Sequence, residues 1–444
     1  MKHTTTELGF KEIEAELFRK LQEQFSFIMK ETLEGIDMEL MEDRDKTRFY
    51  LKDKRSAKVQ TIFGEVEVRR NYYRDNETGD YVYLLDRYLN FKGSQGMSPM
   101  LLEKSIQLAT SGVSYRHARD VLKDLLGYHV ISHEGIRQHM LQTEVVPSET
   151  EEIEREMLFV EVDGLYTKSQ EKNRKGREIK IAGVHQGWDV NGKRVSLKQK
   201  RHFVHHGKAS FWEAFEGFLM ETYDYDPTKH HLVINGDGAQ WITACRDYFQ
   251  HNATFVIDRF HIARDIRSIF REHPRYRAIR KHLAVYDYER MLVELNSAVG
   301  TLEDEKKEEH LEDLIRQLEK YPEALGDYRE ILNQKGINTE GLRPMGSAEG
   351  MMNVFAKRLK QGRSWSNNGL NKFIDVFVAM KDQLEVVTAK GSLKESRNTE
   401  EKSPKYYLEK LGNRVVDVTR NNIGQLQQSM GKPVSQALKG LRGI

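Results

Sequence analysis

The sequence predicts an α/β protein of several domains, one of which is built on a mixed five-stranded sheet. Two observations predict that domain. Residues 157–258 alternate short apolar runs with amphipathic stretches, and residues 263–340 have helical periodicity with almost no strand signal. In addition, 444 residues are more than one ordinary core accommodates. We therefore expect further domains before residue 149.

The first 95 residues predict an amphipathic helical region, 1–45, and a small basic β-hairpin unit, 46–95. Apolar residues between positions 7 and 42 recur at steps of three, four and five, which indicates one long helix or two helices broken near Gly35. These residues are Phe10, Ile13, Leu17, Leu21, Phe25, Ile28, Leu33, Ile36 and Leu40. The hairpin is predicted from alternation in KVQTIFGEVEVRRNYYRD, a turn at NETGD and a resumed strand in YVYLLDRYL.

Residues 96–148 predict three short helices with recognisable start signals. Ser114 and Ser132 are N-cap candidates, and Gly127 ends the helix between them. The last helix carries Arg137 and Gln138, which are side chains that could contact bases. The last two helices together therefore resemble a helix-turn-helix that reads DNA. A plain three-helix bundle gives the same pattern, and both interpretations stay open.

The predicted core domain spans residues 149–262 and 341–388, interrupted by an all-helical insertion at 263–340. Its five strands are expected in MLFVEVDGLYTK, EIKIAGVHQGWDV, GKRVSLKQKRHFVH, HLVING and ATFVIDRF. The first three are joined as antiparallel hairpins, whereas the last two return through helices and should run parallel to the first. A late helix is expected to begin near Ser347. A flexible linker and short tail are expected at 389–444.

Three carboxylates stand out by their positions in this domain. Asp163 lies inside the first strand, Asp237 follows the fourth strand between two glycines, and Glu349 lies in the first turn of the late helix. If the first and fourth strands are adjacent and parallel, Asp163 and Asp237 lie close together. Clustered carboxylates repel one another, and hard cations such as Mg²⁺ or Mn²⁺ relieve that repulsion. Two such ions would suit phosphodiester chemistry.

Each carboxylate also has an ordinary structural explanation. An aspartate beside glycine after a strand is commonly a turn residue, and a glutamate in a first helical turn favours the helix N-terminus. Asp163 is harder to explain in this way, because a carboxylate inside a strand needs compensation. Glu161 lies on the same face of that strand and competes with Asp163 for its role.

Charge is distributed in blocks that point to a nucleic-acid partner. The net charge is only +2, yet residues 44–74 hold ten Lys and Arg against four Asp and Glu. A further basic block follows Glu349. We expect DNA contacts from Arg69, Arg70, Arg137, Gln138, Lys357, Arg358, Lys360 and Arg363. Alternatively, each block is a solvated face.

The sequence argues against a membrane or exported protein and against a disulfide or a multi-cysteine zinc site. The chain has no run of 18 apolar residues and begins without an apolar signal core, so we expect neither a membrane span nor export. Its single cysteine, Cys245, excludes an intrachain disulfide and a multi-cysteine zinc site. A cytoplasmic location is therefore expected.

Several segments together carry a resemblance to a known family. They are FGEVEVRRNYYRD, YLLDRYL, VEVDGLY, INGDGAQWI, IDRFHI and GSAEGMMNVFAKRLKQGRSWS. The chain resembles DDE transposases of bacterial insertion sequences, in the Mutator-like group with a ribonuclease-H-like core. More narrowly, it resembles a family of insertion-sequence proteins often labelled uncharacterised.

The resemblance implies a ribonuclease-H-like sheet with a helical insertion, and it implies catalytic, metal-binding roles for Asp163, Asp237 and Glu349. It also implies an acidic residue or a cysteine shortly before a histidine, downstream of the second acid, and Asp258 and His261 match that pattern here. That histidine would contact the scissile phosphate or hold the shape of the site. The implied cofactors are two Mg²⁺ or Mn²⁺ ions. The implied partners are double-stranded DNA, at terminal inverted repeats and at the target, and at least one further copy of the chain. When bound to DNA the protein would associate with the bacterial nucleoid.

Two other readings share these features. A DNA-binding regulator or inactive transposase remnant needs the basic regions but not three converging acids. A ribonuclease-H-like nuclease such as a junction resolvase shares the acids, but it needs neither the helical insertion nor the large N-terminal half.

Overall fold

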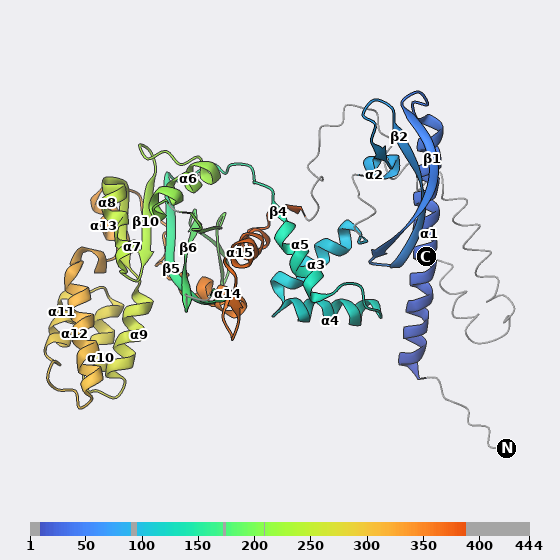
Figure 1. Cartoon of the computed structure of the whole chain (residues 1–444). Coiled ribbons are helices and arrows are strands. Elements are labelled where there is room, and N and C mark those ends of the chain that lie inside the picture. Colours follow the sequence, from blue (N-terminus) through green and yellow to red (C-terminus); the bar gives the residue numbers. More distant parts are fainter. Residues whose placement is uncertain (1–8, 90–95, 172–174, 208, 388–444) are drawn as a thin grey trace, which may run out of the picture. The chain divides into compact units, whose positions relative to one another are not determined.

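The computed structural model describes residues 9–89, 96–171, 175–207 and 209–387 (Figure 1). The chain divides into two compact units, one within residues 1–144 and the other within residues 145–386. Each unit has its own apolar clusters. The tail expected at 389–444 lies outside the described residues.

The first unit begins with one continuous helix, α1 (Phe10–Asp43), which is not broken at Gly35. Strands β1 (Phe49–Thr61) and β2 (Gly64–Asp75) follow it as an antiparallel pair. Ile36 of α1 is buried in a cluster that also contains residues of β2, so tertiary packing holds the helix together across its glycine.

The hairpin differs from the expectation at its far end. β3 is only Tyr81–Val82, and most of YVYLLDRYL forms the short helix α2 (Leu84–Tyr88). Leu85 of α2 is buried in the cluster with Ile36, and this burial favours a helical turn over a continued strand.

Three helices complete the first unit: α3 (Pro99–Ser111), α4 (Tyr115–Leu126) and α5 (His133–Gln142). The N-caps expected at Ser114 and Ser132 are confirmed, since each hydroxyl accepts the N–H three residues later. Each of the three helices contacts the other two. This arrangement is compatible with both the helix-turn-helix and the plain bundle.

The second unit contains a mixed sheet of six strands rather than five. The strands are β5 (Met157–Ser169), β6 (Gly176–His185), β9 (Arg201–Val204), β10 (His231–Gly236), β11 (Ala253–Ile257) and β12 (Ser364–Trp365). Their order is β11-β10-β5-β6-β9, with β12 paired to β5. The expectation that the first and fourth core strands are adjacent and parallel is confirmed by the β5–β10 pairing.

Two expected strands are split by a turn. The end of the second predicted strand forms β7 (Trp188–Asn191), and the start of the third forms β8 (Arg194–Leu197). These two strands pair with each other in a separate two-stranded ribbon. Two further strands, β4 (Glu144–Val145) and β13 (Val386–Val387), lie at the boundary between the units.

Helices surround the sheet of the second unit. They are α6 (Phe211–Tyr223), α7 (Gln240–Thr243), α8 (Cys245–Phe249), α9 (Arg259–Phe270), α10 (Tyr276–Ala284), α11 (Tyr288–Asn296), α12 (Glu305–Lys320), α13 (Tyr328–Gln334), α14 (Ala348–Leu359) and α15 (Asn367–Lys381). Residues 263–340 contain helices and no strand, as expected, and α9 to α12 gather in one group in Figure 1. Helix α14 begins where the sequence predicted, whereas α15 was not predicted.

The side chains of β5 alternate between two packed layers. Leu158, Val160 and Val162 lie in the large cluster that includes α6 and the insertion. Met157 and Phe159 lie in a second cluster that includes α13. By the same alternation, Glu161 and Asp163 lie on this second face, where α14 contacts β5.

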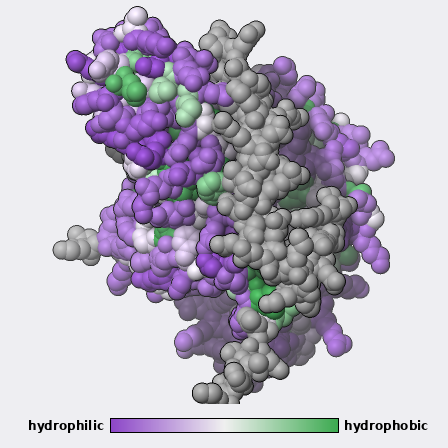
Figure 2. Space-filling view, turned by 90° about the vertical axis from the view of Figure 1, so that its right-hand side faces the viewer, coloured by the Kyte–Doolittle hydropathy of each residue, from purple (hydrophilic) through white to green (hydrophobic). Residues whose placement is uncertain are grey.

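No helix in the described part of the chain is both long and apolar enough to cross a membrane. On the face drawn in Figure 2, hydrophilic residues cover most of the coloured surface.

Candidate active site at the carboxyl edge of the sheet

Three aspartates lie side by side across three parallel strands: Asp163 lies within β5, and Asp237 and Asp258 directly follow β10 and β11. Strand register places Asn235 opposite Glu161 on β5, and Gly236 opposite Ile257 on β11. The Asp258 N–H donates to the Gly236 carbonyl at 2.8 Å, so the pairing continues past the strand ends. Carrying the registers forward therefore aligns Asp163, Asp237 and Asp258 across β5, β10 and β11.

Asp237 is both a turn residue and a member of this row. Its Oδ1 accepts the Ala239 N–H at 2.9 Å, which turns the chain toward α7. Gly238 has a φ of +88°, which favours glycine, and a side chain there would press on Gln317 of α12. The Gln317 amide in turn donates to the Asp237 carbonyl at 2.7 Å. The helical insertion therefore contacts the backbone of this carboxylate directly.

The aspartates of the row interact electrostatically. Burial raises the pKa of Asp163 above its usual value, and the negative charges of Asp237 and Asp258 raise it further. A hydrogen bond from the Gly164 N–H and the nearby His261 act in the opposite direction. A nearby positive charge would therefore stabilise the ionised form of Asp163.

His261 is held by Asp258. The two side chains approach at 3.0 Å between Nδ1 and Oδ2, and Asp258 also accepts the Phe260 N–H to cap α9. This bond raises the pKa of His261, and the charge of Asp163 contributes in the same direction. Asp258 therefore orients His261, and the charge of Asp163 acts on the same ring.

Glu161 does not compete with Asp163 for a place in the row. Its Oε1 accepts the N–H groups of Gly346 and Ser347 at 2.9 and 2.8 Å. Its Oε2 accepts the Ala348 N–H at 3.2 Å and the Asn235 amide at 2.8 Å. The carboxylate thus binds the first turn of α14, the helix that carries Glu349.

The donor set suits a hard cation, but a complete three-residue metal site is not formed. Asp163 and Asp237 each use Oδ1 for a following backbone N–H, leaving Oδ2 as the oxygen available to an ion. Glu349 lies in the first turn of α14. Among the described residues, no three His, Cys, Asp or Glu side chains converge closely enough to hold a metal ion. The expected convergence of Asp163, Asp237 and Glu349 is therefore only partly present.

Comparison with known proteins identifies the family. The model of a family described as "Uncharacterised protein family (UPF0236)" matches residues 3–395. The chain belongs to this family.

Its relatives match over most of their length. The chain is 29% identical over 389 residues to a "UPF0236 protein in vanSb 3'region" of Streptococcus gallolyticus, covering 84% of this chain and 83% of the relative. It is 23% identical over 449 residues to a UPF0236 protein of Caldanaerobacter subterraneus subsp. tengcongensis, covering 96% and 91%. The name of that relative joins eleven numbered designations, and the name of another relative from the same organism joins four.

Two of the arginines expected to contact DNA, Arg70 and Arg358, are buried. Arg70 is 5% exposed, pairs with Asp86 and lies over the Tyr83 ring. Arg358 is also 5% exposed, and its guanidinium lies 4.2 Å from the Phe373 ring centroid. Both arginines hold the cores of their own units together.

The remaining basic and polar candidates are more accessible. Arg69, Lys357 and Lys360 are exposed. Arg137 and Gln138 both donate to Glu134, one turn earlier on α5. Arg363 donates through Nη1 to the carbonyls of residues 357, 358 and 360, so part of its guanidinium closes the end of α14. Binding of DNA by these residues stays a prediction.

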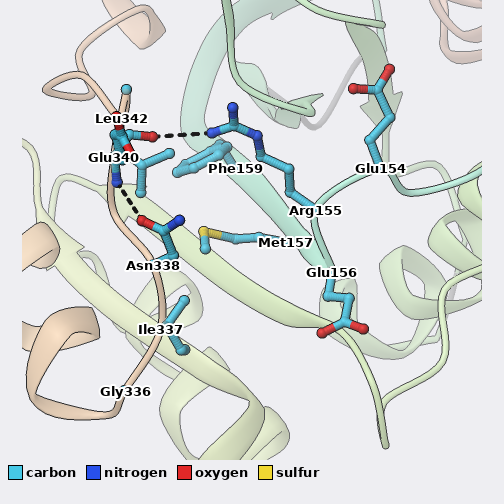
Figure 3. Close-up of a pocket in the computed structure, with 11 residues that line it drawn as sticks. Glu154, Arg155, Glu156, Met157, Phe159, Gly336, Ile337, Asn338, Glu340 and Leu342 are labelled. Atoms are coloured by element: carbon cyan, nitrogen blue, oxygen red, sulfur yellow. Dashed lines mark hydrogen bonds between the residues drawn. The ribbon is translucent and has the colours of Figure 1, made fainter.

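A separate pocket of about 810 Å³ lies at the opposite end of β5 (Figure 3). Met157 and Phe159 line it from the strand, and Arg155 donates to the Glu340 carbonyl across it at 3.1 Å. Met157 precedes Asp163 by six residues, or about 20 Å of extended strand. The pocket is therefore distinct from the aspartate row.

Asp258 is the residue that the sequence prediction missed as a member of the row. A signal for it was present, since each of three core strands places an aspartate after an apolar stretch, in VEVD, INGD and FVID. The sequence cannot give the register, so it did not show that the three would align.

Proposed function

We propose that this protein is a DDE-type transposase of an insertion sequence, with a ribonuclease-H-like core. It would bind the terminal inverted repeats of its element, cut one DNA strand at each end and join the freed 3′-hydroxyl to target DNA. The observation that carries the proposal is the row of Asp163, Asp237 and Asp258, facing the helix that bears Glu349.

The family comparison supports this proposal in one further respect. A relative whose name joins eleven designations is consistent with one sequence present at many positions, which is what a mobile element produces. A regulator that acts at one locus would not require such multiplicity.

The chain's own residues define the chemistry. Asp163, Asp237 and Glu349 would hold two Mg²⁺ or Mn²⁺ ions, which activate the attacking oxygen and stabilise the leaving one when bound. Water would attack phosphorus, forming one P–O bond while the bond to the 3′-oxygen breaks, and the 3′-hydroxyl would repeat this attack on target DNA. His261, oriented by Asp258, would place a protonated nitrogen near a phosphate oxygen.

Exposed cations would position the DNA. Lys357 and Lys360 lie on the last turn and at the end of α14, so they are placed to contact phosphates flanking the scissile one. Arg69 and Arg137 would contribute from the first unit.

A second candidate is a DNA-binding protein without catalysis, either a regulator or an inactive remnant. The incomplete convergence of the three acids favours it. The two functions predict different behaviour of neutral variants. For the transposase, Asp163→Asn, Asp237→Asn and Glu349→Gln each abolish metal-dependent cleavage of end-containing DNA, while a mobility-shift assay shows binding within about twofold of wild type. Binding without cleavage by the wild-type protein itself would support the regulator.

A further inference from the structure

We propose that Glu161 is a positioning residue, whose buried carboxylate fixes the first turn of α14 on β5 and thereby sets where Glu349 stands relative to Asp163. This inference rests on the proposed function, because it assigns Glu161 a part in that same site.

The hydrogen bonds of Glu161 leave it no role as an ion ligand. The side chain is 1% exposed, and its two oxygens accept four hydrogen bonds in total. Four acceptances fill the lone-pair sites of a carboxylate. Three of the donors are successive backbone N–H groups at the start of α14, which are groups that a helix cannot satisfy internally.

Helix α14 depends on this external cap. Ser347 occupies the N-cap position, yet its φ and ψ are −85° and −9°, and its side chain makes no capping bond. The Ser347 hydroxyl is buried and has no hydrogen-bond partner among the described residues. By contrast, Ser210 and Ser366 cap their own helices, α6 and α15. The negative charge of Glu161 therefore replaces a local cap at the positive end of the α14 dipole.

The sheet is built to receive the helix at this point. Gly183 of β6 lies opposite Glu161, and a Cβ there would stand 2.7 Å from the Met351 sulfur of α14. Glycine thus allows the helix to approach the sheet closely. Lys200, whose side chain also borders Gly183, places its positive charge near the Glu161 carboxylate. The buried anion is compensated by Lys200, by Asn235 and by the helix N-terminus together.

The spacing of residues on β5 places Glu161 next to the aspartate row. Glu161 and Asp163 are two residues apart on one face of β5, a rise of about 7 Å. Glu349 directly follows Ala348, the last residue whose backbone N–H donates to Glu161. One strand therefore carries both the first acid of the row and the anchor of the helix that presents the third acid.

The test uses Glu161→Gln in the full-length chain. Glutamine has a similar size but only one oxygen acceptor, and its NH₂ group opposes either the α14 amides or Asn235. We expect amide hydrogen exchange in a peptide covering residues 343–355 to become at least about tenfold faster. We expect the rate constant for metal-dependent cleavage to fall by about 100-fold, with DNA affinity unchanged.

Two further variants separate positioning from general damage. Asp327→Asn is the matched control, because Asp327 is a buried carboxylate that caps a different helix, α13. It should leave cleavage near the wild-type rate. The exchange double variant Glu161→Gln with Asn235→Asp keeps one carboxylate and one amide in the pair, and we expect it to recover part of the lost cleavage rate.

The outcomes are distinct. Unchanged exchange in the 343–355 peptide, or unchanged cleavage by Glu161→Gln, overturns the inference. Equal losses in Glu161→Gln and Asp327→Asn also overturn it, since they indicate loss of stability alone. If the wild-type protein does not cut DNA, the proposed function fails, and faster exchange in Glu161→Gln then shows an anchor with no part in cleavage.

Discussion

Arg69 and Arg70 follow one another in β2, and the alternation of a strand sends their side chains to opposite faces. Arg70 enters the core of the first unit and pairs with Asp86, whereas Arg69 stays exposed. The sequence could not separate them, because a shift of one residue in register exchanges the two faces. Similarly, Arg358 and Lys357 differ only in which side of α14 they occupy.

The two arginines should therefore respond differently to truncation. Arg70→Ala removes a buried ion pair with Asp86 and the contact with the Tyr83 ring, and we expect it to reduce the free energy of unfolding by about 3 kcal/mol. Arg69→Ala should leave that free energy unchanged while weakening DNA binding and lowering its salt slope by about one. Urea unfolding and a salt titration of DNA binding measure these effects. Equal stability of both variants would contradict the structural role of Arg70.

Asp37 provides a test of the first unit that depends on pH. It is 2% exposed, accepts the Asn71 N–H at 2.8 Å, and burial raises its pKa to about 6. The folded state therefore binds the proton more tightly than the unfolded state. Its contribution to stability is greatest at low pH and is lost as pH rises from about 4 to about 6.

Asp37→Asn keeps an acceptor for Asn71 but cannot ionise. We expect the variant to unfold at higher urea than wild type at pH 8, by up to about 2 kcal/mol, and to lose most of this advantage at pH 4.5. An unfolding midpoint that is equal to that of wild type at both pH values would show that Asp37 remains uncharged or well solvated.

Elements with local signals were predicted well. The caps at Ser114 and Ser132 depend on local capping chemistry, and the helical insertion depends on short-range periodicity. Elements decided by tertiary packing were not. The strand pattern of YVYLLDRYL gave way to α2 because Leu85 packs against α1 and β2, and the sixth strand, β12, forms only by pairing with β5.

Exposed apolar residues on the N-terminal half of α1 indicate that the chain self-associates there. Phe10, Ile13, Leu17 and Leu21 are 82%, 45%, 51% and 56% exposed and recur at helical spacing. In an antiparallel pair centred on Leu17, position n faces position 34 − n, so Lys11 faces Glu23 and Glu14 faces Lys20. A second copy of the chain therefore complements this surface in charge and would cover its exposed apolar residues.

We expect light scattering to give the mass of a dimer for the wild-type chain and of a monomer for Leu17→Glu. Val293→Glu is the matched control, since Val293 is an exposed apolar residue of α11 in the second unit, and it should remain dimeric. A monomeric wild-type protein, or a dimer that survives Leu17→Glu, would exclude α1 as the interface.

At the scale of the whole molecule, the candidate site is assembled from distant segments. Asp163, Asp237 and Glu349 could be proposed from their places within a strand, after a strand and at a helix start. Their relation to one another could not, because it depends on strand register and on the Glu161 anchor of α14. The participation of Asp258 follows only when β11 is seen beside β10. The sequence therefore predicts the candidates, and the fold determines which of them meet.

The central claim is that this row cuts DNA at the ends of an element, and one measurement tests it most directly. Purified protein is incubated with linear DNA carrying the regions that flank its gene, with Mg²⁺ or Mn²⁺, and new 3′-ends are mapped against an Asp237→Asn control. We predict metal-dependent cuts at a sequence repeated in inverted orientation on both flanks, with none in the control. Specific binding without any cut under either metal, or cuts that persist in Asp237→Asn, would contradict the account.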